Sequence, residues 1–186
     1  MLWLWILVAA AVLLVLLVVL GYNRLVRLRN EVDTGWANIE VQLQRRADLI
    51  PNLVEAVRAY AAHERAVFEE VTRARAALQQ AQTPGAAADA NEGLSGALGR
   101  LFAVAEAYPE LRASENFLEL QEDLTDTEDK ISAARRYYNA TVNRFNTAVQ
   151  SVPWVFVAKP LGFRAREFFS AQDDTAAPQV SFEPAR

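Results

Sequence analysis

The sequence contains no cysteine and only one histidine. The missing thiols exclude disulfides, thiolate metal sites and cysteine nucleophiles. The lone His63 has Val67 where a zincin would need its second histidine, and Tyr60 does not complete the pair of a di-iron bundle. No phosphate loop, dinucleotide fingerprint or nucleophile elbow can be assembled. We therefore expect no enzyme, no cofactor, no metal site and no small-molecule substrate.

The sequence also lacks a large excess of charge of one sign. The formal net charge is −4, with 19 Lys and Arg against 23 Asp and Glu. A protein that wraps nucleic acid usually presents a strongly basic face, so a nucleic-acid partner is not expected.

Residues 2–20 form an uninterrupted apolar run, LWLWILVAAAVLLVLLVVL. As a helix, this run extends about 28 Å at ~1.5 Å per residue, close to the hydrocarbon thickness of a bilayer. Trp3, Trp5 and Tyr22 mark its two ends, where aromatic rings favour the interface. A cleaved signal peptide would need a basic start, a shorter core and a small-residue cleavage site. The run predicts an uncleaved transmembrane anchor.

Basic residues follow this run, and none precedes it. Arg24, Arg27 and Arg29 come directly after it. The positive-inside rule then predicts a single-pass membrane protein with its N-terminus outside and the remaining chain in the cytoplasm.

Beyond the anchor, apolar residues recur at steps of three and four from Leu25 to Leu43, which indicates one helix face. The stripe resumes from Ile50 to Leu78. Pro51 removes one helical hydrogen bond, so a kink or break is expected near residues 47–50, with Asp48 as a cap for a restarted helix.

Residues 83–93 (TPGAAADANEG) are predicted to form a loop from their Pro, Gly, Asp and Asn content, followed by a short helix over residues 94–107. A long helix is predicted from Glu115 to about Ser151, with Ser114 as its N-cap. Its apolar stripe fits a heptad, and Glu128 is the one polar interruption: Phe117, Leu120, Leu124, Ile131, Tyr138, Val142, Phe145 and Val149.

These patterns predict an all-α protein, in which a single N-terminal transmembrane helix precedes an elongated antiparallel helical bundle with long helices. We expect an anchor over residues 1–22, a cytoplasmic bundle over residues 23–172 and a flexible tail over residues 173–186.

Several stretches resemble the LemA family of bacterial membrane proteins. They are YNRLVRLRNEVDTGWANIEVQLQRRADLIPNLVEAVRAYAAHE at residues 22–64, VTRAR at 71–75, YPELRASENFLELQEDLTDTEDKISAARRYYNATVNRFN at 108–146, GFRAREFF at 162–169 and PQVSF at 178–182. The resemblance covers nearly the whole chain. It implies a mostly helical antiparallel bundle attached to the inner (cytoplasmic) membrane of a bacterial cell, and it supplies no established reaction, cofactor or catalytic residue.

Two polar features of the long helix are candidate interaction sites. An acidic run includes Glu119, Glu122 and Asp126, and it suits either a cation or basic partner, or a solvated helix N-terminus. Asn139, Asn143 and Asn146 recur at steps of four and three, and they suit either a register-setting seam or plain solvent exposure.

Aromatic and basic residues alternate in residues 153–169. Aromatic rings beside cations suit a membrane interface, and the same rings could instead cap an open bundle end while the cations extend into water. The residues concerned are Trp154, Phe156, Phe163, Arg164, Arg166, Phe168 and Phe169.

Together these features predict a non-enzymatic scaffold that self-associates into a homo-oligomer at the cytoplasmic face of the membrane. Its partners would be the lipid bilayer and copies of itself. The alternative is a membrane-bound sensor or adaptor that recruits an unknown protein partner in envelope stress or signalling.

Overall fold

The structure is a computed structural model that describes residues 1–170. These residues form six helices, α1 (Leu2–Arg58), α2 (Arg65–Gln80), α3 (Pro84–Glu106), α4 (Pro109–Arg112), α5 (Glu115–Gln150) and α6 (Val155–Ala158), and no strand. The all-α prediction is confirmed, and α5 begins and ends within one residue of the predicted helix. The predicted tail at residues 173–186 and the PQVSF stretch lie outside the described residues.

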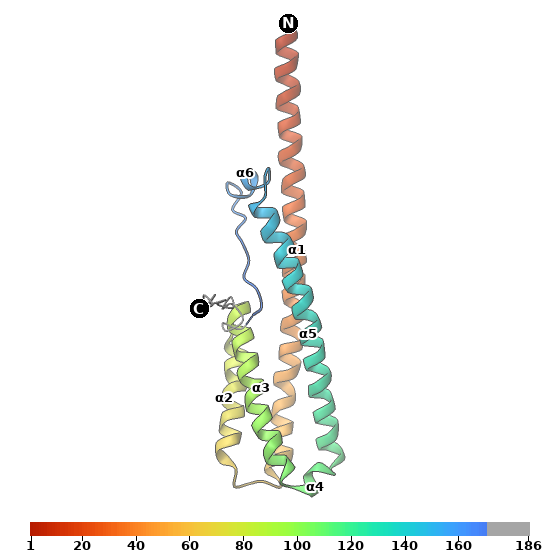
Figure 1. Ribbon diagram of the computed structural model, residues 1–186, viewed down its shortest axis with the longest axis vertical. Helices are drawn as coiled ribbons and strands as arrows, with labels where there is room; N and C mark the ends of the chain where they lie inside the picture. Colours follow the sequence, from red (N-terminus) through yellow and green to blue (C-terminus); the bar gives the residue numbers. More distant parts are fainter. Residues whose placement is uncertain (171–186) are drawn as a thin grey trace, which may run out of the picture. The chain divides into compact units, whose positions relative to one another are not determined.

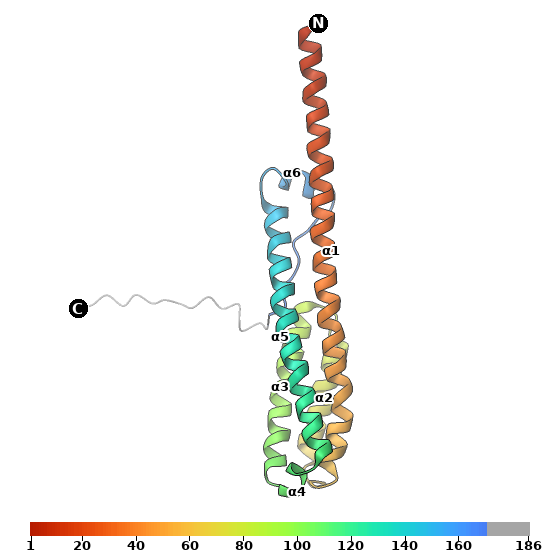
Figure 2. The same cartoon turned by 90° about the vertical axis from the view of Figure 1, so that its right-hand side faces the viewer.

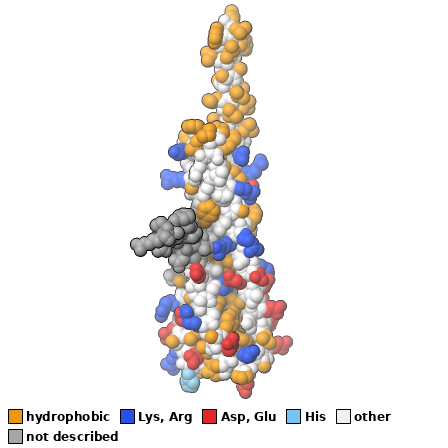
Figure 3. Space-filling model, viewed as in Figure 1, with side chains coloured by type: hydrophobic (Ala, Val, Ile, Leu, Met, Phe, Trp, Pro, Cys, Tyr) orange, Lys and Arg blue, Asp and Glu red, His pale blue; other side chains and the backbone are white. Residues whose placement is uncertain are grey.

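The first part of α1 is the apolar run. It has a mean hydropathy of 3.1, only 6% of its residues are buried, and it is long and apolar enough to cross a membrane. Figure 3 shows hydrophobic side chains covering this end of the chain. An exposed apolar helix of this length is stable in lipid and not in water, so α1 carries a candidate membrane span.

The chain divides into two compact units, and α1 and α5 contribute residues to both. Unit 1 comprises Met1–Asn38 and Ala134–Glu167, and unit 2 comprises Ile39–Ala133 and Phe168–Arg186. The predicted boundary between anchor and bundle near residue 22 stays a prediction.

Unit 2 is an antiparallel four-helix arrangement. The end of α1, α2, α3 and the start of α5 lie side by side, and successive helices run in opposite directions (Figures 1 and 2). Their apolar faces meet in a core that includes Ile39, Ile50, Leu53, Val57, Phe68, Val71, Leu94, Leu101, Phe117, Leu124 and Ile131, each at most 5% exposed. These residues follow the three- and four-residue steps of amphipathic helices, which explains why the sequence folds this way.

In unit 1, α1 packs against the end of α5 and the segment that follows α6. Gly35 permits this close approach, because a side chain there would come within 3.3 Å of the Tyr138 backbone. The shared core includes Leu25, Val32, Tyr138, Val142, Phe145, Ala158 and Phe163.

Of the kink or break expected near residues 47–50, the break is wrong, and the kink at Pro51 stays a prediction. Helix α1 continues through Pro51 to Arg58, and the chain reverses at residues 59–64 instead. Pro51 cannot donate to the carbonyl of Ala47, and Arg75 Nε from α2 donates to that oxygen at 2.7 Å. Asp48 is therefore not a helix cap; it accepts a hydrogen bond from Gln44 one turn earlier, at 2.7 Å.

The loop expected at residues 83–93 is also wrong, because α3 already begins at Pro84. Thr83 is its N-cap and accepts a hydrogen bond from the Ala86 backbone N–H at 3.2 Å. A threonine cap followed by proline at the first helical position is typical of a helix start. Thr83 and Pro84 therefore indicate the beginning of α3 better than they indicate a loop. Burial of Ala87, Ala88 and Asn91 against the bundle offsets the low helix propensity of the glycines.

Candidate functional site

A charged side chain lies inside the four-helix core of unit 2. Arg46 of α1 is 5% exposed and forms an ion pair with Glu128 Oε2 of α5 at 2.7 Å. Its guanidinium also donates to Ser95 Oγ at 3.1 Å and to the side-chain oxygen of Asn91, both on α3. One guanidinium thus joins three helices, and Glu128, the polar interruption of the α5 stripe, is its counter-ion.

Burial lowers the pKa of Arg46, and the neighbouring Glu128 carboxylate partly opposes this shift. Three buried side-chain atoms in this region, Arg46 Nε, Gln42 Oε1 and Glu128 Oε2, have no hydrogen-bond partner among residues 1–170, although Glu128 Oε2 is ion-paired with Arg46. Leaving such atoms unpaired destabilises a core, whereas the ion pair fixes which faces of α1, α3 and α5 meet. The cluster therefore holds α1, α3 and α5 of unit 2 in one arrangement.

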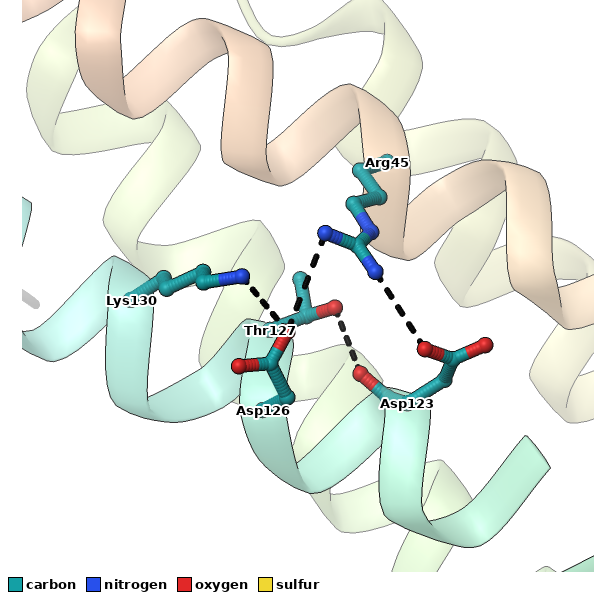
Figure 4. A network of polar contacts seen from close by, with 5 residues as sticks. All are labelled: Arg45, Asp123, Asp126, Thr127 and Lys130. Atoms are coloured by element: carbon teal, nitrogen blue, oxygen red, sulfur yellow. Dashed lines mark hydrogen bonds and ion pairs between the residues drawn. The ribbon is translucent and has the colours of Figure 1, made fainter. Parts of the chain in front are cut away.

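The acidic run of α5 divides into a paired part and an open part. Arg45 of α1 binds Asp123 at 3.2 Å and Asp126 at 3.7 Å, and Lys130 binds Asp126 at 2.7 Å (Figure 4). Thr127 in the same turn donates to the Asp123 backbone carbonyl at 2.7 Å. The hydrogen bond from Lys130, helped by the charge of Arg45, lowers the pKa of Asp126.

Glu119 and Glu122 are exposed instead. Glu119 and Asp123 line an open groove of about 500 Å³, together with Leu49, Asn52, Glu55, Ala56, Asn116 and Leu120. The groove presents three carboxylates beside two carboxamides, an arrangement that suits a cationic group.

The three asparagines of the predicted stripe, Asn139, Asn143 and Asn146, do not share one environment. Asn146 holds the backbone of Arg166: its Oδ1 accepts from the Arg166 N–H at 2.7 Å, and its Nδ2 donates to the Arg166 carbonyl at 2.9 Å. Asn143 is exposed, and Asn139 is half-buried. Asn146 is thus engaged within the chain, and a register role between copies stays a prediction.

The aromatic-basic segment is partly packed and partly exposed. Phe163 is 8% exposed and lies edge-on to Tyr22 and Phe145, at 5.9 and 6.5 Å between ring centroids. Trp154 lies under the guanidinium of Arg24, 5.8 Å from its ring centroid.

Other members of the segment differ in burial. Arg166 pairs with Asp33 at 2.9 Å, and Phe169 is buried in unit 2. Phe156 and Phe168 are exposed by 73% and 39%, and Arg164 is exposed too. Packing therefore accounts for some of these residues and leaves Phe156 unexplained.

His63 lies exposed in the turn between α1 and α2. Within residues 1–170, no group of three or more His, Asp or Glu side chains is arranged to hold a metal ion.

Sequence relatives place this architecture in a family. The model of the LemA family matches residues 35–182. The magnetosome protein MamQ of Magnetospirillum gryphiswaldense is 29% identical over 80% of this chain, which spans 64% of that relative's length. MamQ 2 of Paramagnetospirillum magneticum is 27% identical over 94% of the chain and 74% of its own length. Protein LemA of Metamycoplasma hominis is 25% identical over 81% of the chain and 69% of its own length. The chain belongs to the LemA family.

Proposed function

We propose that this protein is a membrane-anchored helical scaffold that self-associates at the cytoplasmic face of the cell membrane. The observation that carries the proposal is the continuity of α1 from Leu2 to Arg58. Its first part is the exposed apolar run, and its later part supplies buried core residues such as Ile39 and Leu53. One helix thus serves as both the anchor and a structural member of the bundle.

The orientation is supported by the charges that follow the run. Arg24, Arg27 and Arg29 are all exposed in unit 1. Cationic residues next to a span remain on the cytoplasmic side, so the helical units would lie there.

Self-association is supported by large apolar side chains on the surface of unit 2. Val41 of α1 is 62% exposed and Leu118 of α5 is 51% exposed. Burying such apolar side chains between two copies of the chain would stabilise the contact by about 25 cal/mol per Å² of apolar area removed from water.

The test uses the natural absence of cysteine. Val41→Cys and Leu118→Cys variants of the full chain are cross-linked in cells with a bifunctional maleimide, and Ala133→Cys, an exposed position on α5, is the control. We expect dimers and larger species at Val41 or Leu118 and several-fold less at Ala133. Monomer at every position, or equal yields at all three, would contradict a defined interface.

The Leu118→Cys variant also tests orientation. A membrane-impermeant maleimide should label it in lysed cells and leave it unlabelled in intact cells. Equal labelling in both would place the helical units outside the cytoplasm.

A second function, an adaptor that recruits a basic protein partner, is favoured by the acidic groove on unit 2. Its test is the double variant Glu119→Lys/Glu122→Lys, which leaves the Arg45–Asp126–Lys130 contacts intact. Loss of a defined heterologous cross-linked adduct, retained in the exposed control Glu92→Lys, would favour the adaptor. An unchanged adduct would exclude this surface as the docking site.

A further inference from the structure

Residues 152–161, here called the α6 tip, are fastened to α1 where its apolar run ends. The Trp154 ring packs directly on Gly21, so closely that a methyl group there would come within 2.5 Å of the ring. Arg24 covers the same ring, and Ala158 within the tip is fully buried. These contacts fix the level of the tip along α1, because Gly21 directly follows Leu20, the last residue of the run.

The outward side of the α6 tip is apolar. Val152, Phe156 and Leu161 are 75%, 73% and 48% exposed, whereas Phe163 just beyond the tip is buried. Figure 3 shows hydrophobic side chains gathered at this end of unit 1, with Lys and Arg side chains nearby. Three large apolar side chains exposed within ten residues are not explained by packing against unit 1.

Cations accompany these apolar side chains. Lys159 and Arg164 are exposed in or beside the tip, and Arg24 and Arg27 are exposed on the adjacent turns of α1. Apolar side chains flanked by Lys and Arg are typical of segments that lie in the boundary between lipid headgroups and acyl chains.

We propose that the α6 tip is a second, interfacial membrane contact that inserts Val152, Phe156 and Leu161 into one leaflet and binds anionic headgroups through Lys159 and Arg164. The inference rests on the proposed membrane anchor. When residues 2–20 cross a bilayer, Gly21 lies at its boundary, and the contacts of Trp154 hold the tip at the same depth. Each apolar side chain that leaves water then stabilises the bound state, and each cation near anionic lipid stabilises it further.

The experiment measures depth with nitroxide labels on the full chain in nanodiscs that contain anionic phosphatidylglycerol. Single cysteines replace Phe156 and Leu161 at the tip, Leu17 in the apolar run, and Tyr137 of α5. Tyr137 is 47% exposed, and the backbone of the adjacent Tyr138 packs on Gly35, which lies more than two helical turns beyond Gly21 on α1. Power saturation compares collisions with oxygen, which enriches in lipid, and with a water-soluble nickel chelate.

At Phe156 and Leu161, the ratio of oxygen to nickel accessibility should exceed that at Tyr137 several-fold. Phe156→Ser should lower the ratio for the label at Leu161, and Lys159→Gln/Arg164→Gln should lower it in anionic nanodiscs only.

The remaining outcomes separate the inference from the proposed anchor. If Leu17 is protected from nickel while both tip positions resemble Tyr137, the tip does not contact lipid and the anchor stands. If Leu17 is open to nickel, the anchor and the tip contact both fail. Dipolar broadening between tip labels without an oxygen advantage would assign the tip to a second copy of the chain and overturn the lipid contact.

Discussion

Arg75 of α2 donates from its Nε to the backbone carbonyl of Ala47 in α1, at 2.7 Å. This carbonyl would normally accept the N–H of residue 51, which is proline and has none. Ala47 is 1% exposed, so water has little access to the residue. A side chain from the neighbouring helix therefore replaces the missing bond, and α1 continues without a break.

We expect Arg75→Met to lower the free energy of unfolding by roughly 1–3 kcal/mol, because it leaves a buried acceptor without a donor. In a Pro51→Ala background the alanine N–H can donate to the same carbonyl. Arg75→Met should then lower the free energy of unfolding by less. Urea unfolding of the four variants in detergent, followed by circular dichroism, gives the coupling between the two positions. Arg73→Met, an exposed change on the same helix, is the control. If the effects of Arg75→Met and Pro51→Ala on the free energy of unfolding are additive, Arg75 does not replace the hydrogen bond that Pro51 cannot donate.

The Arg46–Glu128 pair predicts an asymmetry between its two partners. Glu128→Leu leaves a guanidinium that is only 6% exposed without its anion, at an expected loss of roughly 3–5 kcal/mol. Arg46→Met leaves a carboxylate whose Oε2 is buried but whose side chain is 43% exposed and partly hydrated, so the loss should be roughly 1–3 kcal/mol. Equilibrium unfolding in urea measures both.

The double variant Arg46→Met/Glu128→Leu should be more stable than Glu128→Leu alone, because no buried charge remains. Arg100→Met, which breaks the exposed pair with Glu70, is the control and should change stability by less than about 1 kcal/mol. Equal losses for the two single variants would show that the pair is not asymmetrically buried.

The sequence predicted the features that periodicity controls. The apolar steps of α5 from Phe117 to Val149 gave its core face correctly, and the run at residues 2–20 gave the candidate span. Both signals are local, since each depends only on which residues recur along one helix. The sequence shows the Glu128 interruption but not its partner Arg46, because spacing along one helix does not say which residue of another helix it meets.

The reversal between α1 and α2 was not predicted, for a similar reason. Residues 59–64 contain no proline or glycine, so local composition gave no turn signal there, whereas Pro51 indicated a helix break that does not occur. Packing of Phe68, Val71 and Leu78 of α2 into the bundle requires the turn at this place, and Arg75 removes the penalty at Pro51. Neither contact is visible before the helices are brought together.

The Tyr138 hydroxyl should lose its proton only at an unusually high pH. It is 2% exposed, its hydroxyl donates to the Glu167 carbonyl at 2.8 Å, and burial raises its pKa to about 12, although the charge of Arg166 opposes the shift. Because the folded pKa lies above the unfolded value near 10, the stabilisation is complete below pH 10 and is lost between pH 10 and 12. The loss should be about 2–3 kcal/mol, at ~1.36 kcal/mol per pKa unit.

Ultraviolet absorbance of tyrosinate follows this titration among the five tyrosines. Tyr138→Phe should remove the absorbance change at the highest pH and reduce the loss of stability above pH 10. Tyr137→Phe, at the exposed neighbouring position, should change neither the absorbance step nor the loss of stability. A late step that persists in Tyr138→Phe would assign it to another tyrosine.

Asn146 should control whether residues 162–167 stay on unit 1. Its carboxamide makes two hydrogen bonds to the Arg166 backbone, and each contributes about 1 kcal/mol, so Asn146→Ala should raise local opening roughly tenfold or more. Trypsin cleavage after Arg164 and Arg166 in the detergent-solubilised chain measures this opening. Asn146→Asp should be intermediate, because a carboxylate can accept from the Arg166 N–H and cannot donate to its carbonyl. The exposed Asn143→Ala is the control and should cleave at the original rate. If Asn146→Ala leaves cleavage unchanged and alters the mass of the oligomer instead, the asparagine serves contacts between copies and not the fastening of this segment.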